Sequence, residues 1–220
     1  MLGALRNALK IEDLRSKIMY TAALLVVFRL GSHVPVPGVN AAALAESLGV
    51  GQGNIFGFLD LFSGGALGRF TIFAMGVNPY ITASIIVQLL QIVIPALDEM
   101  AKEGVEGRKK LQQYTRYGTV VLGIIQGFSI TMLARNMGVV TNPSFFTLSL
   151  IVVTLTAGTI FLMWLGEKIT EKGIGNGVSL IIFTGIIARL PYGFIQSVQS
   201  VGKGGVNPLS FIMFLVLGVV

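Results

Sequence analysis

The sequence predicts an all-α integral membrane protein in which several spanning helices form a bundle. Apolar residues make up 53% of the chain and charged residues only 12%, against about 25% charged residues in soluble domains. The mean hydropathy is +0.80. The charges gather in the gaps between long apolar runs, where membrane proteins carry their topology signals. Because such a chain would expose large apolar patches in water, we expect a bilayer to be its solvent.

The first third of the chain contains one predicted span and one apolar segment that is too short to cross. Residues 1–17 are amphipathic and basic, and predict a cytoplasmic surface segment. Residues 18–34 form the first span, and a loop rich in Pro and Gly follows. The apolar segment at 55–67 is interrupted at Gly64 and falls below the roughly 20 residues that a span requires. Its composition is compatible with a re-entrant, plug-like helix and with an interfacial helix.

Longer apolar runs complete the predicted bundle at residues 70–94, 117–134, 145–165 and 178–197. Together with the first span, these runs predict about five complete transmembrane helices. A further apolar run occupies residues 208–220 and is too short to cross a bilayer. The expected architecture is therefore a multi-span helical bundle with a short plug-like helix and a truncated sixth span.

The distribution of Lys and Arg predicts that the N-terminus lies in the cytoplasm. With this orientation most of these residues fall in cytoplasmic segments, as the positive-inside rule requires. The charged stretch at 98–116 is then a cytoplasmic loop. Its basic residues either mark topology alone or provide a docking surface for a cytoplasmic partner. The candidates for docking are Arg108, Lys109, Lys110 and Arg116.

The residue types present disfavour several classes of function. The chain has no cysteine and a single histidine, His33, which excludes disulfides, thiolate nucleophiles and Cys/His metal clusters. We therefore expect no metal, no cofactor and no enzymatic catalysis. The middles of the predicted spans lack carboxylates and lysines, which counts against an ion-coupled pump. The net charge of +6 comes from residues between the spans, and this placement argues against sequence-specific nucleic-acid recognition.

One face of the predicted 70–94 span carries a pattern of functional interest. Positions that are one helical turn apart share this face. They are occupied by Val77, Ile81, Ser84, Gln88 and Gln91. A polar stripe is costly against lipid, so it must meet protein or water. It indicates either hydrogen bonds between helices or the lining of a pathway that passes from an apolar constriction into a polar groove.

Two further features point to the same region. Pro79 lies inside the predicted span and predicts a kink, which a membrane protein tolerates beside water or protein. The last complete span opens after the glycine-rich stretch 173–177, which predicts a flexible hinge with Asn176 as a helix cap. Val178 and Ile182 then lie one turn apart on one helix face.

Several stretches together resemble the SecY family. They occur in the family's order and at fitting spacing across nearly the whole chain, and this combination is specific where a glycine string alone would be weak. The stretches are Arg29-Leu30-Gly31, Val34-Pro35-Val36-Pro37-Gly38-Val39, Phe62-Ser63-Gly64-Gly65-Ala66-Leu67, Gly76-Val77-Asn78-Pro79-Tyr80-Ile81, Gln113-Tyr114-Thr115-Arg116-Tyr117 and Gly173-Ile174-Gly175-Asn176-Gly177.

The resemblance implies the N-terminal half of a ten-span channel with two pseudo-symmetric halves. Unfolded secretory proteins cross such a channel, and hydrophobic helices leave it sideways into lipid. The resemblance assigns pore-ring roles to Val77, Ile81, Val178 and Ile182, and lateral-gate roles to Ser84 and Gln88. It assigns the plug to Phe62, Ser63, Gly64, Gly65, Ala66 and Leu67. The glycine pair predicts a plug with few fixed contacts, which could move at low cost.

The resemblance also implies partners and a location. The partners are SecE-like and SecG-like small membrane subunits, a SecA motor or a ribosome, signal peptides, nascent chains and the bilayer. The implied location is the cell inner (plasma) membrane. Two alternatives stay open: half of a secondary transporter with broken helices, and a membrane scaffold that transports nothing. Ile160 is expected to face lipid, outside any pathway.

Overall fold

The computed structural model describes residues 11–47, residue 60 and residues 63–188. Within these ranges the regular structure is helical, and the β pairing is limited to the isolated bridges Pro35–Thr71 and Val39–Val140. Several predictions fall outside the described residues. They concern residues 1–10, most of the 55–67 segment including Phe62, the end of the span at 178–197, and the run at 208–220.

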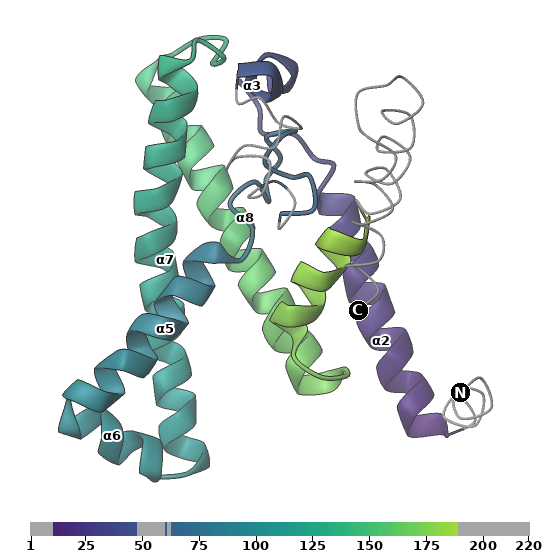
Figure 1. Cartoon of the computed structure of the whole chain (residues 1–220), viewed down its shortest axis with the longest axis vertical. Coiled ribbons are helices and arrows are strands. Elements are labelled where there is room, and N and C mark those ends of the chain that lie inside the picture. Colours follow the sequence, from purple (N-terminus) through teal and green to yellow (C-terminus); the bar gives the residue numbers. More distant parts are fainter. Residues whose placement is uncertain (1–10, 48–59, 61–62, 189–220) are drawn as a thin grey trace, which may run out of the picture.

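Helices form most of the described chain (Figure 1). Their bounds are α2 Glu12–Gly31, α3 Ala41–Ser47, α5 Asn78–Val93, α6 Pro95–Lys102, α7 Val105–Asn136 and α8 Phe145–Lys172, followed by a helix at Gly177–Ala188. The long helices α7 and α8 pack against each other. Helix α5 packs on α7, α6 contacts both α5 and α7, and α2 packs against α8.

The lengths of these helices suit a membrane. Helices α7 and α8 are each long and apolar enough to cross a bilayer. Helices α5 and α6 meet the same criteria only as a pair, which is bent by 104° at the break between them. The described part of the chain therefore contains two candidate spans, or three if the bent pair counts as one.

The second predicted span begins later than its hydropathy indicates. Residues 63–77 run as successive turns, and the α5 helix starts only at Asn78. Phe70 and Gly76 have φ angles of 43° and 59°, which an α-helix does not accommodate. The predicted start at Phe70 is therefore wrong. An apolar sequence that winds through turns inside the protein has the same hydropathy as the start of a span.

The predicted kink at Pro79 is also absent. Pro79 lies in the first turn of α5, where a backbone N–H would have no acceptor within the helix, so its absence in proline costs no hydrogen bond. The bend occurs instead at Ile94, whose φ of −105° and ψ of 108° are extended, and Pro95 starts α6 immediately afterwards. A residue before proline prefers this extended conformation.

The charged stretch at 98–116 is largely helical and is not the predicted loop. Helix α6 ends at Lys102, and α7 begins at Val105 after a turn through Gly104, whose φ is +78°. A Cβ on Gly107 would overlap the carbonyl oxygen of Met100, so the missing side chain allows α6 to fold closely onto α7. The first turns of α7 thus carry the basic residues on a rigid helix.

Two apolar clusters hold the fold together around α8. The first unites Val36, Leu44, Phe70, Ile151 and Leu155, and so joins α3 and the turns after residue 63 to the first half of α8. The second is built from Phe28, Ala66, Phe73, Val77, Leu162, Leu165, Ile169 and Ile181. This second cluster brings together α2, the 63–77 segment, α8 and the helix at 177–188.

Candidate functional site

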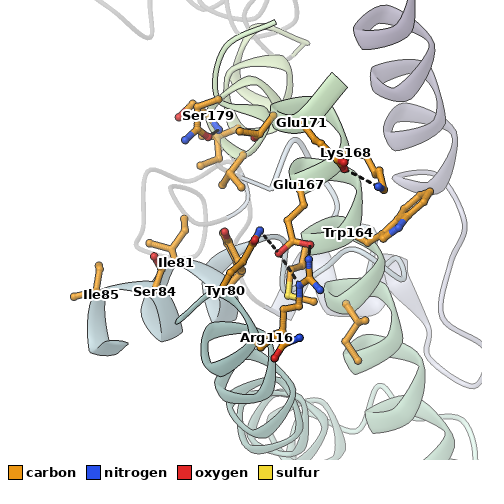
Figure 2. Close-up of a pocket in the computed structure, with 18 of the residues that line it drawn as sticks. Tyr80, Ile81, Ser84, Ile85, Arg116, Trp164, Glu167, Lys168, Glu171 and Ser179 are labelled. Atoms are coloured by element: carbon orange, nitrogen blue, oxygen red, sulfur yellow. Dashed lines mark hydrogen bonds and ion pairs between the residues drawn. The ribbon is translucent and has the colours of Figure 1, made fainter. Parts of the chain in front are cut away.

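A groove of about 1090 Å³ opens between α5, α7, α8 and the helix at Gly177–Ala188. Its wall includes the predicted pore-ring residues Ile81, Val178 and Ile182. The predicted gate residues Ser84 and Gln88 line it as well. Figure 2 shows how α5 brings Ile81 and Ser84 to this groove. Side chains from two distant parts of the sequence therefore meet at one cavity.

Val77 is the remaining predicted ring residue, and it lies beneath the groove wall. It precedes the first residue of α5 and is 6% exposed, within the second apolar cluster. Ile81, Val178 and Ile182 are partly buried and pack against that cluster. The branched aliphatic side chains thus form a continuous apolar patch, of which Val77 is the buried part.

Glycines bring the helix at Gly177–Ala188 unusually close to α8. A Cβ on Gly177 would overlap the carbonyl oxygen of Gly166, and a Cβ on Gly166 would lie 2.9 Å from Val178 Cγ2. The two ends of the stretch 173–177 are therefore closely packed, whereas residues 174–176 are exposed and no atom lies within 4 Å of a Cβ built on Gly175. The flexibility expected of this stretch stays a prediction. The predicted cap is present, since the Ser179 N–H donates to Asn176 Oδ1 at 3.1 Å.

Two residues of the predicted polar stripe on α5, Ser84 and Gln88, line the groove, whereas Gln91 does not. Gln88 Nε2 donates to Ser84 Oγ at 3.2 Å, one turn back along the same helix, and both side chains line the cavity. Gln88 is exposed and Ser84 is partly buried. This arrangement favours the lining of a pathway over hydrogen bonding between helices.

An ion pair between α7 and α8 forms another part of the groove wall (Figure 2). Arg116 Nη2 lies 2.8 Å from Glu167 Oε2, and Arg116 Nε donates to Glu167 Oε1 at 3.0 Å. Gln112 Nε2 donates to the same Oε1 at 3.0 Å. The carboxylate of Glu167 is only 9% exposed. A two-point contact of this kind fixes both position and orientation.

The predicted plug residues that the structure describes are packed within the protein. Ser63, Ala66 and Leu67 are buried, and Ser63 Oγ donates to the Asp60 carbonyl oxygen at 3.0 Å. A Cβ on Gly64 would lie 2.9 Å from the Cα of Gly185 on the last described helix. The prediction of few fixed contacts is therefore wrong for this segment. The glycines permit a close fit of backbone against backbone.

Comparison with known proteins decides the family. A family model described as SecY matches residues 71–220.

The chain belongs to the SecY family.

Relatives within the SecY family cover nearly the whole chain. The protein translocase subunit SecY of Halalkalibacterium halodurans is 50% identical over an alignment of 222 positions, which covers 99% of this chain and 51% of that relative. The corresponding subunit of Escherichia coli strain K12 is 48% identical over 209 residues, which are 93% of this chain and 47% of that relative. The chain thus spans about half the length of the curated relatives it matches.

Solved structures share the fold of this SecY-family chain. Sec61 in a canine ribosome–channel complex from the endoplasmic reticulum matches with a TM-score of 0.62 and 21% identity, over 94% of this chain and 47% of that one. A protein-conducting channel matches with the same values. At this identity the likeness establishes the fold alone. The predicted multi-span helical membrane fold is confirmed, and the chain is a membrane protein.

Sequence reasoning about this SecY-family chain missed the Arg116–Glu167 pair. Arg116 was grouped with the docking candidates, whereas its guanidinium points into the groove toward Glu167. Gln112 and Arg116 lie one turn apart on α7, and this polar spacing was the available signal. The other candidates are exposed near the start of α7, where Lys109 also lines the groove. Arg108 is exposed, Lys109 lies 3.4 Å from Glu106, and Lys110 lies 3.7 Å from Glu103.

Ile160 was expected to face lipid, and this expectation is wrong. Ile160 lines the groove together with Met163 and Trp164. The hydropathy of a helix does not distinguish lipid from an apolar cavity wall. Among the described residues, no group of three or more His, Cys, Asp or Glu side chains gathers into a metal site.

We expect Glu167→Gln to weaken the packing of α7 on α8, because a neutral amide cannot form the ion pair with Arg116. The expected loss of unfolding free energy is about 1.5 kcal/mol, measured by denaturant titration in detergent. The matched control is Glu171→Gln. Glu171 pairs with Lys168 inside α8 alone, and an exposed pair of this kind contributes little. Equal losses in the two variants would contradict the bridging role of Glu167.

Proposed function

We propose that this chain forms the N-terminal half of a protein-conducting channel. Unfolded secretory polypeptides pass along the groove, and hydrophobic helices leave it sideways into the membrane. In this proposal Val77, Ile81, Val178 and Ile182 form this half's share of the pore ring. Ser84 and Gln88 form its side of the lateral gate, and the segment around Gly64 is the plug.

The observation that carries the proposal is the shared groove. Ile81 comes from α5 and Ile182 from the last described helix, yet both line the same cavity of about 1090 Å³. Branched aliphatic side chains offer no ligand that could replace the hydration shell of an ion, and a narrow apolar neck can lose its water. Their contacts are non-directional, so they accommodate any passing side chain without binding it. These properties fit a seal around a polypeptide.

The polar side of the groove supports the lateral exit. The Ser84–Gln88 face is already accessible from the cavity. If a neighbouring helix separates from α5 at this face, polar side chains become exposed to water and no apolar interface is lost. Such a face favours the entry of a signal peptide between helices. The energy for translocation comes from outside the chain, from a SecA-like motor or a ribosome.

The proposal includes an orientation and partners. The N-terminus and the α6–α7 turn lie in the cytoplasm of a cell with the channel in its inner membrane, as the distribution of Lys and Arg supports. The exposed basic residues Arg108, Lys109 and Lys110 then face a cytoplasmic partner. SecE-like and SecG-like small membrane subunits complete the assembly.

Site-specific crosslinking tests the proposal. Ile81 and Ile182 are replaced by cysteine one at a time, and each cysteine is the single reactive thiol because the chain has none of its own. A secretory chain is then stalled in transit in native membranes. Adducts are expected at both positions. Ile125 is the control, since it is 55% exposed on α7 and does not line the groove. Absence of adducts at Ile81 and Ile182 in a correctly inserted protein would overturn the assigned path.

A further inference from the structure

The side chain of Thr21 links α2 to the turn that precedes the last described helix. Thr21 is 7% exposed, and its hydroxyl donates to the Lys17 carbonyl oxygen at 2.8 Å within α2. The same oxygen accepts the backbone N–H of Ile174 at 3.1 Å. One hydroxyl therefore satisfies two partners, and the second of them lies on a distant part of the chain.

The turn at residues 173–177 is held from two sides by threonine hydroxyls. Thr170 Oγ1 on α8 accepts the Gly177 N–H at 2.8 Å, while Thr21 holds Ile174 from α2. A Cβ on Gly173 would overlap Thr21 Oγ1 and the Ile169 carbonyl oxygen. The absence of a side chain at Gly173 thus allows the close approach that the Thr21 contact requires.

The location of this contact gives it a consequence for the groove. Val178 is the second residue of the helix that begins after the turn, and Ile182 lies one turn further along. Any movement of the turn relative to α2 therefore moves both side chains. Helix α8 also holds the start of this helix, through Thr170 and the close contact of Gly166 with Val178, and Thr21 adds the hydrogen bond that fixes the turn relative to α2.

We propose that Thr21 is a positioning residue, whose hydroxyl fixes the N-terminal end of the Gly177–Ala188 helix and so the placement of Val178 and Ile182 in the groove. The geometric claim rests on the contacts of Thr21 with Ile174 and Gly173. Its effect on sealing rests on the proposed channel function. No side chain of α2 lines the groove itself, and Phe28 on α2 belongs to the buried cluster against which Val178 and Ile182 pack.

A spin-label distance measurement tests the geometric claim. Labels are attached to cysteines that replace Met19 on α2 and Phe183 on the last described helix, which are 66% and 56% exposed. The channel containing the full chain is reconstituted in vesicles of phosphatidylethanolamine and phosphatidylglycerol. Thr21→Val removes the acceptor with little change in shape, whereas Thr21→Ser keeps the hydroxyl.

The expected distance distribution is narrow in wild type and in Thr21→Ser, and shifted or broadened in Thr21→Val. The matched control is Thr154→Val, because the hydroxyl of Thr154 bonds only within α8, to the Leu150 carbonyl oxygen at 2.7 Å. An unchanged distribution in Thr21→Val, or equal broadening in Thr21→Ser, would overturn the proposal.

Ion leak through the same vesicles tests the consequence for the groove. The loss of one hydrogen bond shifts a conformational equilibrium by roughly fivefold, so Thr21→Val is expected to raise leak about fivefold over Thr21→Ser. A wild-type leak level in Thr21→Val would overturn the positioning of the seal. Absence of crosslinks at Ile182 in the wild-type channel would instead overturn the proposed function, and the distance result would still decide the role of Thr21.

Discussion

In the proposed channel, replacement of both Ile81 and Ile182 by asparagine is expected to raise the ion leak roughly thirtyfold over wild type. Both side chains line the groove and pack against the buried cluster that contains Val77. An amide in place of each aliphatic side chain lowers the cost of wetting by about 1 kcal/mol, and 1.4 kcal/mol corresponds to a factor of ten. The measurement is potassium efflux from vesicles that contain the reconstituted channel.

The control for this variant is Ser84→Asn, which places the same amide on the polar side of the same groove. It is expected to leave the leak unchanged, because that wall already carries polar groups. If the double variant inserts and folds normally yet does not leak, the apolar patch is not a seal. The interpretation of the chain as a scaffold would then account better for the groove.

Gly64→Ala is expected to unseat the proposed plug. Gly64 has a φ of +65°, and a Cβ there would lie 2.9 Å from the Cα of Gly185. The left-handed conformation costs an alanine about 1–2 kcal/mol. The contact with Gly185 adds overpacking of about 1–3 kcal/mol, which only a shift of one backbone can relieve. Because the two costs together exceed the 1.4 kcal/mol that corresponds to a factor of ten, we expect at least about tenfold more leak and freer acceptance of secretory chains with defective signal sequences.

The variant Gly76→Ala distinguishes the effect of backbone strain from the effect of the contact between residues 64 and 185. Gly76 has a similar φ of +59°, but no atom lies within 4 Å of a Cβ built there. This variant is therefore expected to lose stability without any increase in leak. Equal leak in the two variants would show that backbone strain alone is responsible, and that Gly185 is not the seat of the plug.

The fold class could be predicted because long apolar runs mark helices that avoid water. The start of α8 at Phe145 coincides with the start of an apolar run, and residues one turn apart on α5 do line one groove. Both properties are local. They follow from composition and from the 3.6-residue period of a helix, and no knowledge of the neighbouring elements is needed.

The errors arise where a distant contact decides the outcome. The segment at 63–77 is as apolar as a span, but it runs as turns against α8. The decisive contact is between Gly158 and Ile72, where a Cβ on Gly158 would overlap the Ile72 carbonyl oxygen. The Arg116–Glu167 pair and the groove-facing side of Ile160 likewise depend on which helices become neighbours. A single sequence does not encode these pairings in any local pattern.

The contact between Gly64 and Gly185 has a further consequence for biogenesis. At a synthesis rate of about 5–20 residues per second, Gly185 is made roughly 6 to 24 s after Gly64. Gly158, against which the turn at Ile72 packs, is also synthesised later than that turn. The segment around Gly64, which is the plug of the proposed channel, is therefore synthesised before the residue that it packs against. In the proposed channel this segment can be seated only after α8 and the helix at Gly177–Ala188 have inserted.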